Sequence, residues 1–188
     1  MTDTEVESEL KIPVAELTTI RSRLVDVNAN LITENTREVN LLLDSNDHAL
    51  SARGCVLRLR SSGELRILTF KGPASYDGHI KVRPEHEVHI EDVEKMRRVL
   101  ESLGFSGVAR YEKDRETWRA GDVEIVLDHT PMGDFVEVEG PPELLESVAR
   151  SLGLDPSHAV RGSYMSLWSE FRAGNPERNL PRDMVFGE

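Results

Sequence analysis

Charged side chains alternate with apolar ones along several short segments of the sequence. Residues 5–12, EVESELKI, place a glutamate or a lysine at every odd position, and residues 57–60, LRLR, place an arginine at every second position. A period of two is that of a β-strand, in which successive side chains point to opposite faces. Each such strand therefore has one ionic face, and both signs of charge occur on these faces.

Eight basic residues lie on such faces or at the end of such a strand. They are Lys11, Arg58, Arg60, Lys71, Lys81, Arg83, Lys113 and Arg115. A triphosphate concentrates several negative charges on hard oxygen atoms, and its binding calls for arginine forks and lysine point charges on different sides. We therefore predict that these eight side chains bind a triphosphate.

Acidic residues share the same strand faces. They are Glu7, Glu9, Glu137 and Glu139, with Asp128 and the pair Glu85 and Glu87 as further candidates. Carboxylate oxygens are the ligands that Mg²⁺ and Mn²⁺ prefer. The acids therefore predict a site for Mg²⁺ or Mn²⁺, which would bridge phosphate oxygens and leave positioning and charge stabilisation to the protein.

The elements that position these residues are short strands with helices between them. Strands are predicted at 5–12, 38–44, 55–60, 64–71, 81–91, 110–118, 122–128 and 135–139. Helices are predicted at 14–25, 92–103 and 144–152 and from Ser163 onward, with Pro13 in the first turn of the first helix. Regular βαβ alternation is lacking, so the pattern indicates an α+β domain and not a parallel sheet.

The ionic strand faces can be arranged in two ways. Any one of them could be the solvent face of an open sheet. Several equally regular ionic faces favour a closed antiparallel eight-stranded β-barrel with a polar lumen, because buried charges are tolerated when they are paired, hydrated or bound to a ligand. We predict that residues 1–172 form this domain with its flanking helices and that residues 173–188 form an irregular C-terminal tail.

Composition excludes several other classes of protein. A formal net charge of -11 argues against binding to nucleic acid or to an anionic membrane, which call for a basic surface. No apolar run approaches the roughly 18 residues of a membrane span, and the acidic N-terminus is unlike a secretory signal, so a cytoplasmic protein is expected. The single cysteine, Cys55, lies beside Val56 and Leu57 and is expected to be a buried structural thiol.

The motifs together resemble the CYTH superfamily, the triphosphate tunnel metalloenzymes that include class IV adenylyl cyclases, thiamine triphosphatases and inorganic triphosphatases. Residues 7–11, ESELK, match its ExExK signature, and the resemblance extends over about residues 5–170. It continues in order through LRLR (57–60), LTFKGP (68–73), KVRPEHE (81–87), YEKDR (111–115), VLD (126–128), GDFVEVEG (133–140) and SY (163–164). The resemblance implies a tunnel lined by the basic residues, a metal held by Glu7, Glu9, Glu137 and Glu139, and a homodimer.

Candidate catalytic residues are Lys71 and Lys11. By resemblance, Lys71 matches a lysine that in thiamine triphosphatases belongs, with a tyrosine, to the apparatus that activates water. Here Leu42 or Leu43 stands where that tyrosine would be. This departure argues against the lysine–tyrosine mechanism and against thiamine triphosphate as the substrate.

Three functions remain open from the sequence. The first is metal-dependent hydrolysis of inorganic triphosphate or of a nucleoside triphosphate such as ATP. The alternative is the class IV cyclase reaction, in which the ribose 3′-hydroxyl of ATP attacks the α-phosphorus and pyrophosphate leaves. A non-catalytic polyphosphate- or nucleotide-binding module is a third, although a pure anion binder has little use for a second set of acids. No GxxxxGK[ST] phosphate loop occurs.

Overall fold

The structure is a computed structural model that describes residues 6–187. The strands are β1 (Val6–Val14), β2 (Asn30–Ser45), β3 (Val56–Ser62), β4 (Leu65–Lys71), β5 (Ser75–Asp77), β6 (Ile80–His89), β7 (Phe105–Ala120), β8 (Val123–Thr130) and β9 (Gly133–Glu139). The α-helices are α1 (Leu17–Asp26), α2 (Ala49–Ala52), α3 (Val93–Ser102), α4 (Pro142–Ser151) and α5 (Tyr164–Gly174). Two 3₁₀ turns, η1 (Pro156–His158) and η2 (Pro176–Arg178), complete the described elements.

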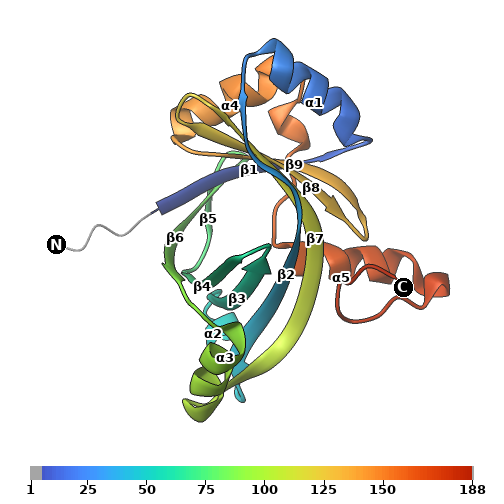
Figure 1. Cartoon of the computed structure of the whole chain (residues 1–188). Coiled ribbons are helices and arrows are strands. Elements are labelled where there is room, and N and C mark those ends of the chain that lie inside the picture. The colour runs from blue at the N-terminus through green and yellow to red at the C-terminus, as the bar shows by residue number, and fades with distance from the viewer. Residues whose placement is uncertain (1–5, 188) are drawn as a thin grey trace.

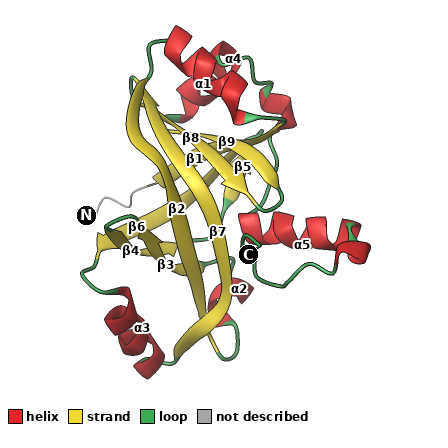
Figure 2. Cartoon of the chain, turned by 45° about the vertical axis from the view of Figure 1, so that its right-hand side comes forward, coloured by secondary structure: helices red, strands yellow, loops and turns green. Residues whose placement is uncertain are grey.

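Eight of the strands close into an antiparallel barrel (Figures 1 and 2). Their order is β1-β9-β8-β7-β2-β3-β4-β6, and β6 pairs back with β1. The short β5 pairs with β6 at residues 80–82, beyond the stretch at 85–89 that pairs with β4. The predicted closed eight-stranded antiparallel barrel with flanking helices is confirmed.

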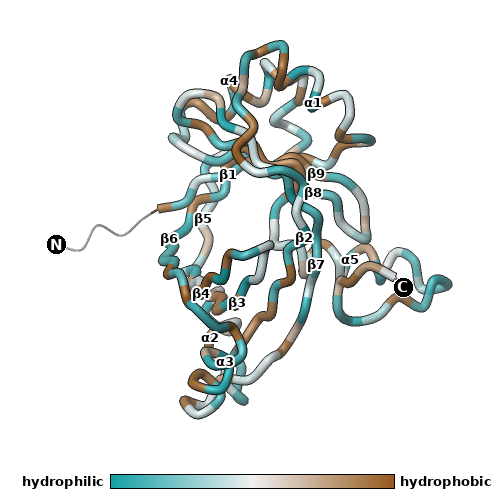
Figure 3. Tube along the Cα trace, viewed as in Figure 1, coloured by the Kyte–Doolittle hydropathy of each residue, from teal (hydrophilic) through white to brown (hydrophobic). Residues whose placement is uncertain are grey.

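The two faces of each strand have different environments. Figure 3 shows hydrophilic and hydrophobic stretches following one another along the barrel strands. On β8 and β9, the outward residues Ile125, Leu127 and Val138 are fully buried beneath helices, whereas Glu124, Glu137 and Glu139 on the opposite face line the lumen. The main hydrophobic core therefore lies outside the barrel wall and leaves the lumen to polar side chains.

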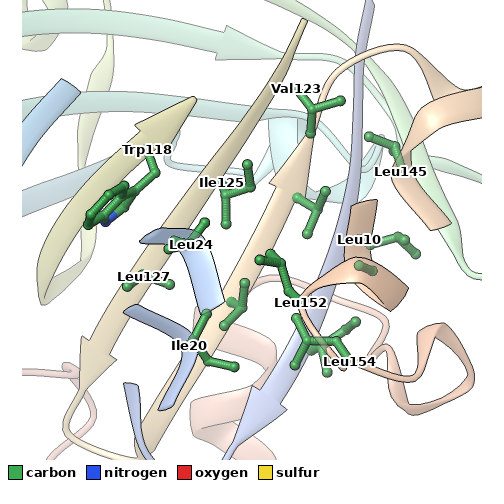
Figure 4. Packing of buried hydrophobic residues seen from close by; sticks show 14 of the residues in the cluster. Leu10, Ile20, Leu24, Trp118, Val123, Ile125, Leu127, Leu145, Leu152 and Leu154 are labelled. Atoms are coloured by element: carbon green, nitrogen blue, oxygen red, sulfur yellow. The ribbon is translucent and has the colours of Figure 1, made fainter. Parts of the chain in front are cut away.

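Helices α1 and α4 cover this core at one end of the barrel (Figures 1 and 4). Helix α1 buries Ile20 and Leu24, and α4 buries Leu145, in one cluster with Leu10 of β1. Helix α3 packs at the other end (Figure 1), where Leu100 joins a smaller cluster. Asp92 accepts a hydrogen bond from the backbone N–H of Lys95 and caps α3, as is common at helix starts.

Several predicted boundaries are wrong. Pro13 lies in β1 and not in a helix, and α1 begins at Leu17. Beyond Glu9, β1 pairs with β9 on one side and no longer with β6 on the other. Pro13, which has no backbone N–H to donate, is therefore tolerated there. Pro84 lies within the continuous strand β6, where the pairing partner changes from β1 to β4. Glu5 of the first predicted strand lies outside the described residues.

Strands β2 and β7 are much longer than predicted. Each runs for 16 residues, and their outer parts pair as a ribbon in which Leu31 lies opposite Trp118. Residues 30–36 are mostly exposed and lack an apolar face, so their residue pattern has no period that would predict a strand. Helix α2 lies between the strands predicted at 38–44 and 55–60 and is held by Asp44, which accepts hydrogen bonds from the backbone N–H groups of Leu50 and Ser51 at 2.9 Å.

The segment after α5 packs back onto the barrel. Met184 is fully buried and forms a parallel bridge with Tyr111 of β7, where the pairing of β7 with β8 has not yet begun. The helix itself extends to Gly174 and so includes the first two residues of the predicted tail. Cys55 is buried, as expected. Among the described residues, no helix is long and apolar enough to cross a membrane.

We predict that Leu145→Ala lowers the free energy of unfolding by about 2–5 kcal/mol, because it leaves a cavity between α4 and the barrel wall. Leu145 is 0% exposed, whereas its neighbour Leu144 is 36% exposed and provides a matched control. Urea denaturation of both variants measures the effect. Equal losses for Leu144→Ala and Leu145→Ala would contradict the placement of the core outside the wall.

Candidate active site in the barrel lumen

The lumen contains a cavity of about 370 Å³ whose wall is mostly ionic. All eight predicted basic residues line it, as do the acids Glu7, Glu9, Glu85, Glu87, Glu137 and Glu139. These residues come from six different strands and reach one space because of the period-two alternation. The structure thus brings the predicted residues together, with Asp128 as the exception.

Three acids converge at one end of the cavity. Glu7, Glu9 and Glu139 each offer a carboxylate oxygen, and these oxygens all lie within 4.8 Å of one another. The register explains this, because Glu9 of β1 lies directly opposite Glu139 of β9. Burial and the neighbouring charge of Glu137 raise the pKa of Glu139 to about 8. A hard divalent cation fits this set, since it would neutralise carboxylates that repel one another.

Glu137 and Asp128, also predicted as metal ligands, lie outside the group formed by Glu7, Glu9 and Glu139 and contact cations. Glu137 lies opposite Lys11 in the sheet, and its carboxylate is 3.0 Å from the Lys11 ammonium. Asp128 is 0% exposed and accepts hydrogen bonds from Lys113 at 2.9 Å and from the hydroxyl of Tyr164 at 2.7 Å. Both acids also pair with Arg115. They position basic side chains in this structure.

Lys71 lies between two acids on different strands. Its ammonium is 2.8 Å from Glu7 and 2.7 Å from Glu85. Burial and the proximity of Glu7 raise the pKa of Glu85 to about 8, whereas Lys71 overcomes the effect of burial and lowers the pKa of Glu7 to about 2. One proton is therefore retained on this pair near neutral pH, and Lys71 stays charged.

Two other predicted basic residues have contrasting partners. Lys81 contacts Glu9 at 2.6 Å and connects the acidic end to the basic wall. Arg83 donates from Nε to the backbone carbonyl of Gly72 at 2.9 Å and from Nη2 to that of Gly54 at 3.3 Å. Arg83 thus uses part of its guanidinium to hold two loops, a role that strand periodicity could not predict.

Sequence reasoning missed several lumen residues. Glu38 of β2 pairs with Arg60 at 3.2 Å and Lys113 at 3.6 Å, and burial is outweighed by these and neighbouring cations, so its pKa is lowered to about 2. Tyr111 accepts a hydrogen bond from Arg58 at 3.2 Å. Tyr111 precedes Lys113 by two residues, so the period of two was an available signal for it.

The structure also shows where Tyr164 lies and which leucine occupies the position at which the family resemblance led us to expect a tyrosine. Tyr164 of α5 lies beneath the ammonium groups of Lys11 and Lys113, which are 4.3 and 4.9 Å from its ring centroid. Its side chain therefore combines helix packing with a contact to the lumen. Leu42 lines the cavity, whereas Leu43 packs outside the wall. Leu42 is thus the lumen residue at the position where a tyrosine was expected.

We predict that Asp128→Asn destabilises the protein by about 3 kcal/mol, because two buried cations lose their shared counter-charge. Asp122→Asn, at an exposed position in the turn before β8, is the control and should change stability by less than about 0.5 kcal/mol. Urea denaturation at neutral pH compares the two. If the two variants were equally stable, Asp128 would not be holding Lys113 and Arg115 in place.

Known proteins resemble this chain in sequence and in fold. Adenylate cyclase CyaB of Aeromonas hydrophila is 25% identical over 185 residues, which cover 92% of this chain and 93% of the relative. The structure of a candidate adenylate cyclase from Vibrio parahaemolyticus superposes with a TM-score of 0.81 at 20% identity, covering 89% and 99% of the two chains.

Another protein of similar fold has a different activity. A candidate adenylyl cyclase from Hippeastrum, described as having a dominant triphosphatase activity, matches with a TM-score of 0.62 at 18% identity and covers 89% and 96% of the two chains. These two structural likenesses show the fold. The family model of the CYTH domain matches residues 5–163, which include every predicted site residue. This chain therefore belongs to the CYTH domain family.

Proposed function

We propose that this protein hydrolyses the terminal phosphoanhydride bond of a triphosphate, inorganic or nucleoside, with Mg²⁺ or Mn²⁺. The observation that carries the proposal is the division of the lumen into an acidic end of converging carboxylates and a basic wall from several strands. Proteins of the CYTH family are metal-dependent. The triphosphatase activity described for the Hippeastrum protein supports hydrolysis within this fold.

In this proposal, the basic residues bind the three phosphates from different sides of the barrel. Lys11 and Lys71 are the candidate catalytic residues, since each places a charged ammonium where charge develops on leaving oxygens. Although burial opposes it, Glu9 and Glu137 raise the pKa of Lys11, which keeps the ammonium charged. Bound by Glu7, Glu9 and Glu139, the metal ion would neutralise phosphate charge and polarise phosphorus.

The acids outside that trio have a different proposed role. Glu137 and Asp128 orient Lys11, Lys113 and Arg115 toward the phosphates. A triphosphate would compete with these acids for cations that are already charged and positioned, so little reorganisation accompanies binding. The homodimer and the cytoplasmic location expected from the sequence stay predictions.

Cyclisation of ATP is the second candidate function. The relative from Aeromonas hydrophila is named an adenylate cyclase, and part of the cavity wall is apolar. Leu42, Val56 and Met165 line this part, which could contact a nucleobase. A purely binding module is disfavoured, since three carboxylates that converge in an anion-binding cavity would weaken binding in the absence of a metal.

Product identification separates these functions. Purified protein is incubated with inorganic triphosphate and, separately, with ATP, in the presence of Mg²⁺ or Mn²⁺. Orthophosphate with pyrophosphate or ADP is expected. Cyclic AMP with pyrophosphate from ATP would overturn hydrolysis in favour of cyclisation, and tight binding without turnover would favour the binding module.

We expect Glu9→Gln and Glu139→Gln to lower metal-supported turnover about 100-fold or more, because each removes a charged oxygen ligand. Glu143→Gln, an exposed change in the first turn of α4, is the control. Turnover is measured against metal concentration. Unchanged metal dependence in both lumen variants would rule out the proposed metal site.

We expect Lys81→Gln to weaken binding of inorganic triphosphate roughly 10- to 100-fold, the loss of one charge-assisted hydrogen bond. Lys95→Gln provides the control, because the Lys95 side chain is 83% exposed. Thermal unfolding with increasing triphosphate reports the affinity, since a ligand that binds the native state raises the melting temperature. Equal melting shifts in both variants would exclude Lys81 from the binding wall.

A further inference from the structure

Tyr111 is a buried lumen residue without a role in the function proposed so far. It is 7% exposed, lines the cavity from β7 and lies opposite Asn40 of β2. Its hydroxyl oxygen accepts a hydrogen bond from Arg58 at 3.2 Å. Within residues 6–187, no acceptor receives a hydrogen bond from the Tyr111 hydroxyl, so its proton is not committed to the protein.

The groups around Tyr111 favour its deprotonated form. Arg58 and Arg60 approach from β3, and Lys113 lies on β7 itself. Although burial alone would raise the pKa of Tyr111, these three cations lower it to about 8. The other titratable groups of the surrounding elements are Glu38 of β2, paired with Arg60 and Lys113, Tyr164 of α5, and Glu85 and Glu87 of β6, which contact Arg58.

The position of Tyr111 is fixed from outside the barrel. Its backbone bridges to Met184, and the N–H of Glu112 donates to the carbonyl of Met184 at 2.7 Å. The Tyr111 ring packs in one cluster with Phe135, Tyr164, Trp168 and Met184. The segment after α5 thus holds a lumen tyrosine in one orientation, as a preorganised catalytic group requires.

Other groups in the described lumen are less suited to accept a proton. Glu7, Glu9 and Glu139 belong to the proposed metal site, Glu38, Asp128 and Glu137 are ion-paired, and Glu85 is held by the ammonium of Lys71 at 2.7 Å. Glu87 already accepts hydrogen bonds from Thr69 and Arg58. The hydroxyl of Tyr164 donates a hydrogen bond to Asp128, and burial with the charge of Asp128 raises the pKa of Tyr164. Tyr111 differs from all of these.

We propose that Tyr111 is the general base of the proposed hydrolysis and that Arg58 is the positioning residue that stabilises its phenolate. The phenolate oxygen takes a proton from a water molecule while the water oxygen forms a bond to the terminal phosphorus. The bond from that phosphorus to the bridging oxygen breaks, and the oxygen leaves with the electron pair as diphosphate. Orthophosphate is the other product, and Tyr111 then releases its proton to solvent. This inference rests on the proposed function.

The test is Tyr111→Phe, which keeps the ring and its packing and removes the hydroxyl. With inorganic triphosphate and Mg²⁺, we expect kcat to fall about 100-fold or more, the usual contribution of a general base. The change in KM should be small, because the hydroxyl would act in the transition state. Wild-type kcat/KM should rise with pH through about 8, since the base acts when deprotonated. The rise should be smaller in the variant, because Tyr111 no longer contributes and only carboxyl groups such as Glu85, whose pKa is also about 8, remain.

Two controls keep the result specific. Tyr164→Phe removes the second tyrosine hydroxyl among the described residues that line the cavity and should retain the rise in kcat/KM near pH 8. The ultraviolet difference spectrum of the phenolate, wild type against Tyr111→Phe, follows the same ionisation without any turnover. One tyrosine that titrates near pH 8 in the wild type and is missing from the variant supports the assignment.

The outcomes separate the two proposals. If the wild type hydrolyses triphosphate while Tyr111→Phe keeps kcat and the pH dependence, Tyr111 is not the base and the proposed function stands. A difference spectrum without a tyrosine ionising near pH 8 would also overturn the assignment. If the wild type releases no orthophosphate, the proposed function and this assignment fail together, and the difference spectrum still reports the phenolate.

Discussion

The compensation of buried charge in the lumen is the constraint on which the rest of the structure depends. Each unpaired ion in a low-dielectric interior costs several kcal/mol, so acids and bases must meet at close range. The pairing of β1 with both β6 and β9 meets this requirement at one residue. Glu9 lies opposite Lys81 on one side and opposite Glu139 on the other. The like-charged pair of Glu9 and Glu139 could be neutralised by a bound cation. The unlike pair of Glu9 and Lys81 connects these acids to the basic wall.

A barrel with a charged interior must obtain its stability elsewhere. Here the apolar residues of the same strands point outward and pack beneath α1 and α4, where Leu10, Ile125 and Leu145 are fully buried. The alternation of side chains along each strand links the two requirements, because a shift by one residue would exchange the core and the lumen. The hydrophobic core therefore fixes the register that aligns the charged side chains. Stability and site geometry depend on the same pairing.

Residues whose role depends on their own strand could be predicted from the sequence. Glu7, Glu9 and Lys11 follow a period of two, and their shared face is confirmed by the cavity that they line. Residues whose role depends on a distant partner could not. Asp128 follows the same period, but its pairing with Lys113 and Arg115 depends on the register of β8 against β7, and it lies outside the lining of the cavity. A pattern of residue types predicts a face but not which charges on it meet.

Segments whose structure departs from their local propensity also could not be predicted from the sequence. Pro13 is typical of the first turn of a helix. It lies in a part of β1 that pairs with β9 and no longer with β6, where a missing N–H is tolerated. The outer part of β2 contains exposed polar residues that form a strand because the matching ribbon of β7 supplies the hydrogen bonds. In both cases the partner strand decides the local structure, and tertiary context overrides the local signal.

The same distinction bears on the choice of reaction. Binding of three phosphates depends on the basic wall, which hydrolysis and cyclisation would share. The choice of nucleophile depends on what lies beside the phosphorus under attack. On one side of the cavity, Leu42 and Met165 pack against the cluster that contains Tyr111. In the proposed hydrolysis the tyrosine would activate water, whereas in cyclisation the apolar side chains would contact the nucleoside. The two candidate reactions therefore differ in what they require of this short stretch of wall, whereas both require the charged lumen as a whole.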